Sequence, residues 1–80
     1  MTERPTFDYS ILEGKIKQYY DTQENFAKEI PMSRSTLNQK IQNNLDFTSQ
    51  NIYRISELLN ISREEIGDVF FKVKSSENRI

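Results

Sequence analysis

Apolar residues recur at intervals of three and four along most of the chain, which is the spacing of one face of an α-helix. Short polar stretches divide these residues into five series, so the sequence predicts an all-α fold of five short helices. A residue able to cap a helix N-terminus precedes each series: Asp8, Thr22, Ser33, Thr48 or Ser49, and Ser62. The expected inward-facing residues are Tyr9, Leu12, Ile16, Tyr19 or Tyr20, Phe26, Ala27, Ile30, Leu37, Ile41, Ile52, Ile55, Leu58, Leu59, Ile66, Val69 and Phe70.

The helical pattern predicts a single domain over residues 8–71. Residues 1–7 hold one proline and little pattern, so we expect a flexible arm there, and we expect residues 72–80 to form a tail. Within the domain, Pro31 is expected to end the second helix, because the residue before a proline is pushed out of helical geometry. The sequence SREE at residues 62–65 matches a capping box and predicts the start of the fifth helix.

Two further positions carry local signals. Gly14 lies inside the first predicted helix, where glycine costs about 1 kcal/mol relative to alanine, and it could allow a close helix contact. Asn43 and Asn44 follow the third predicted helix, and asparagine is favoured where the chain reverses direction.

The composition of the 80 residues excludes several kinds of site. There is no cysteine for a disulfide or a zinc thiolate, and no histidine, the usual general base and the commonest transition-metal ligand. No phosphate-binding glycine loop or nucleophile–base pair is present, so we expect no catalysis, cofactor, metal ion or small-molecule substrate. The longest apolar runs are two or three residues, so we expect no membrane span and a cytoplasmic protein.

The segment ENFAKEIPMSRSTLNQKIQ at residues 24–42 points to a binding function. Its second and third helices are joined by only a few residues, which predicts the steep crossing of a helix-turn-helix. In that unit the N-terminal residues of the second helix reach base edges in the major groove, where arginine can bind guanine and asparagine adenine. The formal charge of −1 argues against DNA binding, but residues 31–56 hold three basic residues against one acidic residue.

The sequence TQENFAKEIPMSRSTLNQKI resembles the helix-turn-helix of phage Cro and repressor proteins, and NIYRISELLNISREEI resembles their fourth and fifth helices. The resemblance covers about residues 8–71 and implies a λ-repressor-like domain. It departs from the family at the turn, where glycine is usual and this chain has Pro31. Because proline cannot take a positive φ, the turn must close in another way.

The resemblance implies a sequence-specific regulator that binds double-stranded operator DNA in a bacterial host cell, as a Cro-like phage or prophage repressor associated with the nucleoid. The implied base-reading residues are Arg34, Ser35, Asn38 and Gln39. The residues implied to approach phosphates are Gln23, Ser33, Lys40, Asn43, Thr48, Gln50 and Asn51.

The C-terminal part of the domain suggests a homodimer and also leaves a second function open. One recognition helix covers few base pairs, so we expect two copies to join around residues 66–74. Residues 71–74 alternate apolar and basic side chains, as a strand does. The alternative function is a protein-binding module of the antitoxin or antirepressor type, which the acidic sequence and the apolar VFFKV segment both suit. The expected dimer residues are Ile66, Phe70, Phe71 and Val73, although Phe70 could instead complete the core of the monomer.

Overall fold

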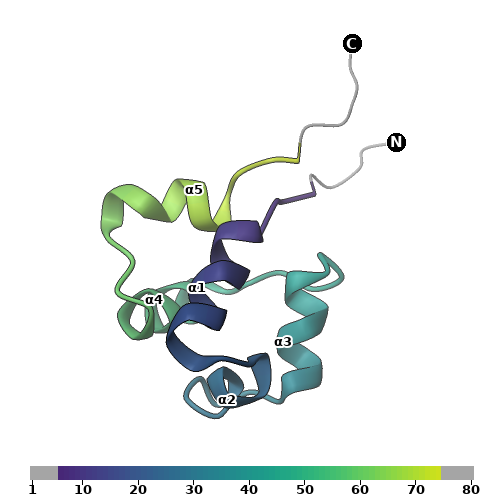
Figure 1. Ribbon diagram of the computed structural model, residues 1–80. Coiled ribbons are helices and arrows are strands. Elements are labelled where there is room, and N and C mark those ends of the chain that lie inside the picture. Colours follow the sequence, from purple (N-terminus) through teal and green to yellow (C-terminus); the bar gives the residue numbers. More distant parts are fainter. Residues whose placement is uncertain (1–5, 75–80) are drawn as a thin grey trace.

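The computed structural model describes residues 6–74, and this part of the chain is helical. Five α-helices and one 3-10 helix follow one another, with no strand among the described residues (Figure 1). This confirms the predicted all-α fold of five short helices. Their bounds are Ser10–Tyr20 (α1), Gln23–Ala27 (α2), Arg34–Ile41 (α3), Ser49–Leu58 (α4), Arg63–Glu65 (η1, the 3-10 helix) and Ile66–Phe70 (α5).

The core lies around α1, which packs against both α2 and α5. Leu12 and Ile16 of α1 are buried, and each of the other four α-helices adds at least one buried apolar residue. The predicted inward positions are all buried or partly buried except Tyr19, because Tyr20 takes the inward place at the end of α1. Residues between the helices complete the core: Tyr9, Ile30, Met32, Phe47, Leu59 and Ile61.

Side chains cap most of the helices as the sequence predicts. Thr22 Oγ1 accepts the backbone N–H of residue 25, and Ser33 Oγ accepts that of residue 36, at 3.1 and 3.0 Å. Thr48 forms a reciprocal capping box with the residue three positions on, and Ser62 does the same at η1. Contrary to the prediction, Asp8 is not the N-cap of α1; Tyr9 occupies that position and the helix begins at Ser10. The Asp8 carboxylate nevertheless accepts a hydrogen bond from the backbone N–H of Ser10.

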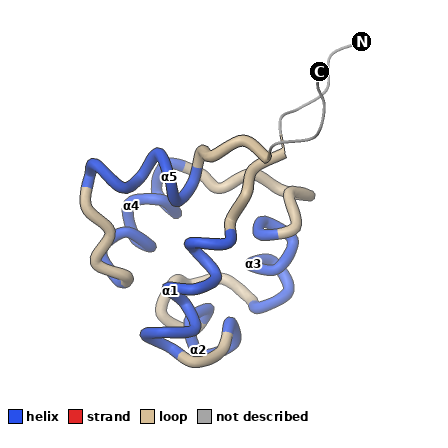
Figure 2. Tube along the Cα trace, turned by 45° about the horizontal axis from the view of Figure 1, so that its top comes forward, coloured by secondary structure: helices blue, strands red, loops and turns tan. Residues whose placement is uncertain are grey.

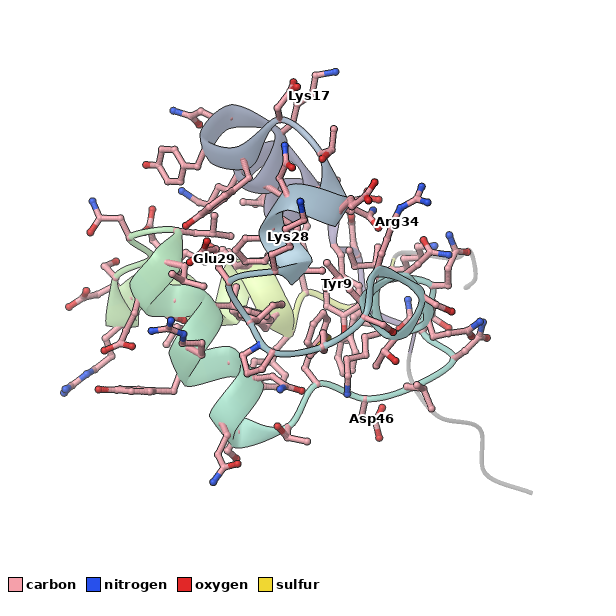
Figure 3. All side chains as sticks on the ribbon, turned by 90° about the horizontal axis from the view of Figure 1, so that it is seen from below. Tyr9, Lys17, Lys28, Glu29, Arg34 and Asp46 are labelled. Atoms are coloured by element: carbon pink, nitrogen blue, oxygen red, sulfur yellow. The ribbon has the colours of Figure 1, made fainter. Side chains whose placement is uncertain are left out.

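The connection between α2 and α3 accommodates Pro31 without a left-handed residue. Among the described residues, positive φ occurs only at Asp21, Asn43 and Asn60, each of which follows a helix. None of the three lies within residues 28–33, which connect α2 to α3. Helix α2 ends at Ala27, before the position that we predicted from the proline. The turn is therefore spread over residues 28–33, and the two helices still cross steeply, as the view along α3 in Figure 3 shows.

The two ends of the described chain lie side by side. Phe7 and Val73 form an isolated antiparallel bridge. The purple and yellow segments run side by side in Figure 1, and the tan segments before α1 and after α5 do so in Figure 2. The expected arm and tail therefore meet at residues 6–8 and 72–74, while the rest of both, residues 1–5 and 75–80, lies outside the described residues. None of the described helices is long and apolar enough to cross a membrane.

Candidate functional site

The four implied base-reading residues lie together on the outer face of α3. Arg34, Ser35 and Asn38 are exposed and line a shallow hollow of about 330 Å³, and Figure 3 shows the Arg34 side chain pointing away from the core. Gln39 is also exposed, and its Oε1 accepts a hydrogen bond from Asn44 Nδ2 at 2.8 Å. The structure therefore brings these residues together on a polar face with a single cation.

Lys40, implied as a phosphate contact, faces inward. Lys40 is only 9% exposed, and its ammonium donates a hydrogen bond of 2.7 Å to the backbone carbonyl of Asp46. This bond spans the loop between α3 and α4, so the lysine closes the loop that leads to Phe47. The ammonium therefore already has an acceptor within the protein, and its role as a phosphate contact stays a prediction.

Other implied phosphate contacts also bind within the chain. Ser33 and Thr48 cap α3 and α4, and the Asn51 side chain completes the Thr48 capping box. Gln23 is partly buried at the start of α2, whereas Gln50 is exposed at the start of α4. The capping residues thus have a structural role that requires no ligand.

The nearby cation Arg54 is likewise engaged. Its guanidinium donates to the backbone carbonyl of Glu29 at 3.3 Å and lies 3.7 Å from the carboxylate of Glu57. These contacts tie α4 to the connection after α2. They also reduce the positive charge that this side of the molecule can offer to a phosphate backbone.

An apolar groove opens at the other end of the molecule, beside the paired chain ends. Its volume is about 400 Å³. We call it the terminal groove, and its lining residues are Phe7, Tyr9, Asp46, Phe47, Ile52, Phe70 and Phe71. Phe70 and Phe71 were expected from the sequence as dimer residues. Phe7 and Phe47 could not be expected there, because both lie outside the helices and reach the groove only through the fold.

Aromatic rings connect the terminal groove to the core. The rings of Tyr9 and Phe47 meet edge-on with centroids 5.2 Å apart, and Phe47 contacts Phe70 at 5.5 Å. At the outer end, Phe7 meets Phe71 edge-on at 5.9 Å. Edge-to-face packing of this kind stabilises aromatic pairs beyond the area that they bury. The groove therefore has a firm aromatic floor, of which Phe71 is the exposed end.

The four expected dimer residues divide into two groups. Phe70 is 1% exposed and belongs to the core, so it completes the monomer and offers almost no surface to a second copy. Ile66 is partly buried, whereas Phe71 and Val73 are 51% and 58% exposed. Only the last two offer large apolar surface to a partner, and the dimer itself stays a prediction.

A charged cluster lies next to the paired chain ends. The backbone N–H of Ser10 holds the pKa of the Asp8 carboxyl below its ordinary value, and the Ser10 hydroxyl, Lys72 and Lys74 act in the same direction. The carboxylate is thereby kept charged at the start of α1, where it is stabilising. Among the described residues there is no group of acidic side chains that could hold a metal ion.

Comparison with known proteins places the chain in a family. The family model described as "Protein of unknown function (DUF739)" matches residues 5–73, which is most of the chain. The chain belongs to the DUF739 family. No curated protein matches it.

Among solved structures, this DUF739 protein is similar to the modulator of repression (MOR) of the temperate bacteriophage TP901-1 from Lactococcus lactis, a solution structure. The two chains are 31% identical, with a TM-score of 0.73. The match covers 81% of this chain and 88% of the MOR chain.

These comparisons correct the predicted function. The prediction of a DNA-binding, Cro-like repressor is wrong: the matching family is DUF739, and the structural relative is named as a modulator of repression. The alternative, a protein-binding module, agrees better with both findings. The physical reason for the error is that one fold can carry different functions, which depend on the surface rather than on the helix-turn-helix pattern.

Proposed function

We propose that this protein is a phage-associated regulatory module that binds a repressor protein and thereby modulates repression. The observation that carries the proposal is the similarity to MOR, which extends over most of both chains at 31% identity. A likeness of this extent supports a shared type of activity as well as a shared fold. The formal charge of −1 is also low for a protein that would bind DNA directly.

We assign the contact to the terminal groove. Protein interfaces are enriched in aromatic side chains, and a few such residues in well-packed pockets usually provide most of the binding energy. Phe71 meets these conditions, because half of its surface is exposed while its ring rests edge-on against Phe7. The neighbouring rings of Tyr9 and Phe47 give the groove a fixed shape.

The test uses the purified repressor encoded nearest to the gene for this protein, titrated by calorimetry. The wild-type protein should bind it, and Phe71→Ala should weaken the affinity about tenfold or more. Tyr53→Ala is the matched control, since Tyr53 is an aromatic residue that is 68% exposed and lines a different hollow. In a parallel assay, the wild-type protein should change the occupancy of the operator by the repressor.

Two results would count against the proposal. Wild-type protein that neither binds the repressor nor changes its operator occupancy would remove the proposed function. Binding that is weakened equally by Phe71→Ala and Tyr53→Ala would remove the terminal groove as the contact.

A further inference from the structure

The paired chain ends form a very short antiparallel ladder. Hydrogen bonds of 2.7 and 2.8 Å join residues 6–8 to residues 72–74 on either side of the bridge between Phe7 and Val73. Phe7 and Val73 are therefore a pair without mutual hydrogen bonds, and their backbone N–H and C=O groups point outward, to opposite edges of the ladder.

The outer edge at Phe7 is closed. Asn43 Oδ1 accepts the Phe7 N–H at 2.9 Å, and Asn43 Nδ2 donates to the Phe7 carbonyl at 3.0 Å. The side-chain amide thus makes the two hydrogen bonds that a neighbouring strand would make. This edge cannot accept another chain while Asn43 is in place.

The opposite edge, at Val73, is open. No described residue bonds to the N–H or C=O of Val73, and the residue is 58% exposed. Unpaired groups on an exposed strand edge are a template for a further extended chain. We call this feature the Val73 edge.

The side chains beside the Val73 edge divide into an apolar and a basic face. Directly opposed residues of an antiparallel pair share a face, so Val73 lies on the same face as Phe7, while its neighbours Lys72 and Lys74 point to the other face. Phe71 joins Phe7 and Val73 on this face through its ring contact with Phe7, at a centroid distance of 5.9 Å. The apolar face continues into the terminal groove, which Phe7 and Phe71 line.

We propose that the protein partner adds an extended segment to the Val73 edge, with apolar side chains on the Phe71 side and acidic side chains opposite Lys72 and Lys74. This inference rests on the proposed function and specifies how the partner is held. Backbone hydrogen bonds supply affinity in such strand addition, and alternate side chains supply specificity.

The charges favour a different chain over a second copy. An antiparallel pair of two copies centred on Val73 would set Lys72 of each copy opposite Lys74 of the other. Like charges directly opposite one another destabilise a strand pair, whereas opposite charges stabilise it. Asp8 already lies near both lysines on the side of the ladder away from the Val73 edge, so it leaves that edge to the partner.

The test compares two substitutions at one position in the full chain. Val73→Pro removes the backbone N–H that would donate a hydrogen bond to the partner. Val73→Thr keeps this N–H and has a side chain of nearly the same size. We expect Val73→Pro to weaken calorimetric binding to the purified repressor about tenfold more than Val73→Thr does. Replacing Lys72 and Lys74 together by glutamine should weaken it by about threefold.

A second measurement needs no substitution. Amide hydrogen exchange at Val73 in the wild-type protein should slow at least about tenfold when the repressor is added, because the N–H gains a hydrogen bond. An unchanged exchange rate, or equal binding by Val73→Pro and Val73→Thr, would overturn the inference while leaving the proposed function standing. A wild-type protein that dimerises alone, and loses the dimer with Val73→Pro, would assign the edge to a second copy. Absence of any repressor binding by the wild type would instead refute the proposed function.

Discussion

The side-chain amide of Asn43 makes two hydrogen bonds to the backbone of Phe7, 36 residues earlier in the chain, at 2.9 and 3.0 Å. Asn43 itself has a φ of 70°, in the left-handed region that ends α3. One residue therefore both reverses the chain and holds the N-terminal segment against the body of the domain. Through Phe7 it also fixes one wall of the terminal groove.

Two substitutions separate these roles of Asn43. Asn43→Gly keeps the left-handed backbone free of strain but removes the amide, so we expect it to lower the free energy of unfolding by about 1–3 kcal/mol. Asn43→Ala should lower it by roughly a further 1 kcal/mol, because alanine is strained at positive φ. Urea unfolding of both variants checks this. An Asn43→Gly protein as stable as the wild type would show that the two hydrogen bonds contribute nothing net.

The core prediction concerns Leu37, which is fully buried between α3 and its neighbours. Leu37→Ala should lower the free energy of unfolding by about 2–5 kcal/mol, since it deletes packed methyl groups and leaves a cavity. Leu45→Ala is the matched control, because Leu45 is 46% exposed and should change stability by less than about 1 kcal/mol. Similar losses for the two variants in urea unfolding would contradict the burial described for α3.

Gly14 offers a stabilising substitution. The close helix contact that the sequence allowed at this position is absent: a Cβ added at Gly14 would meet no described atom within 4 Å. Gly14→Ala should therefore raise the free energy of unfolding by about 1 kcal/mol and the melting temperature by roughly 4–8 °C. A melting temperature that falls would indicate that something packs against this face of α1.

Two carboxylates should make the stability of the fold depend on pH in the acid range. The N–H of Ser10 lowers the pKa of Asp8, and the N–H of Ser62, assisted by Lys15, lowers that of Glu65. Because the folded-state pKa values lie below the unfolded ones, this stabilisation is complete above about pH 4–5 and is lost as the pH falls through the folded values. In urea unfolding, the Asp8→Asn, Glu65→Gln double variant should lose less stability between about pH 5 and pH 3 than the wild type does. An identical pH dependence would contradict the assignment.

Local features of the fold could be predicted from the sequence. The caps at Thr22, Ser33 and Thr48 depend on residues no more than three positions away, and the structure confirms each of them. The inward positions also follow from spacing alone, because burying one face of each helix leaves few other arrangements. The spacing could not decide whether Tyr19 or Tyr20 faces inward, because the two residues are adjacent at the end of α1.

Features that depend on distant contacts could not be predicted. Lys40 appears in the sequence as one more surface cation, and only the return of the chain at Asp46 places an acceptor beside its ammonium. The bridge between Phe7 and Val73 and the amide of Asn43 likewise join segments far apart in the sequence. The terminal groove depends on these contacts and therefore could not be predicted. The α3 face could be recognised from the sequence, because its residues lie within a few positions of one another.

The measurement that tests the central claim most directly is a map of the repressor contact by two-dimensional NMR of the isotope-labelled protein. If the protein is a repressor-binding module that uses the terminal groove, adding unlabelled repressor should change the amide chemical shifts most at Phe7, Phe47, Phe71 and Val73. The exposed residues of α3 should change little. Shift changes centred on Arg34, Ser35 and Asn38, or none at saturating repressor, would contradict the account.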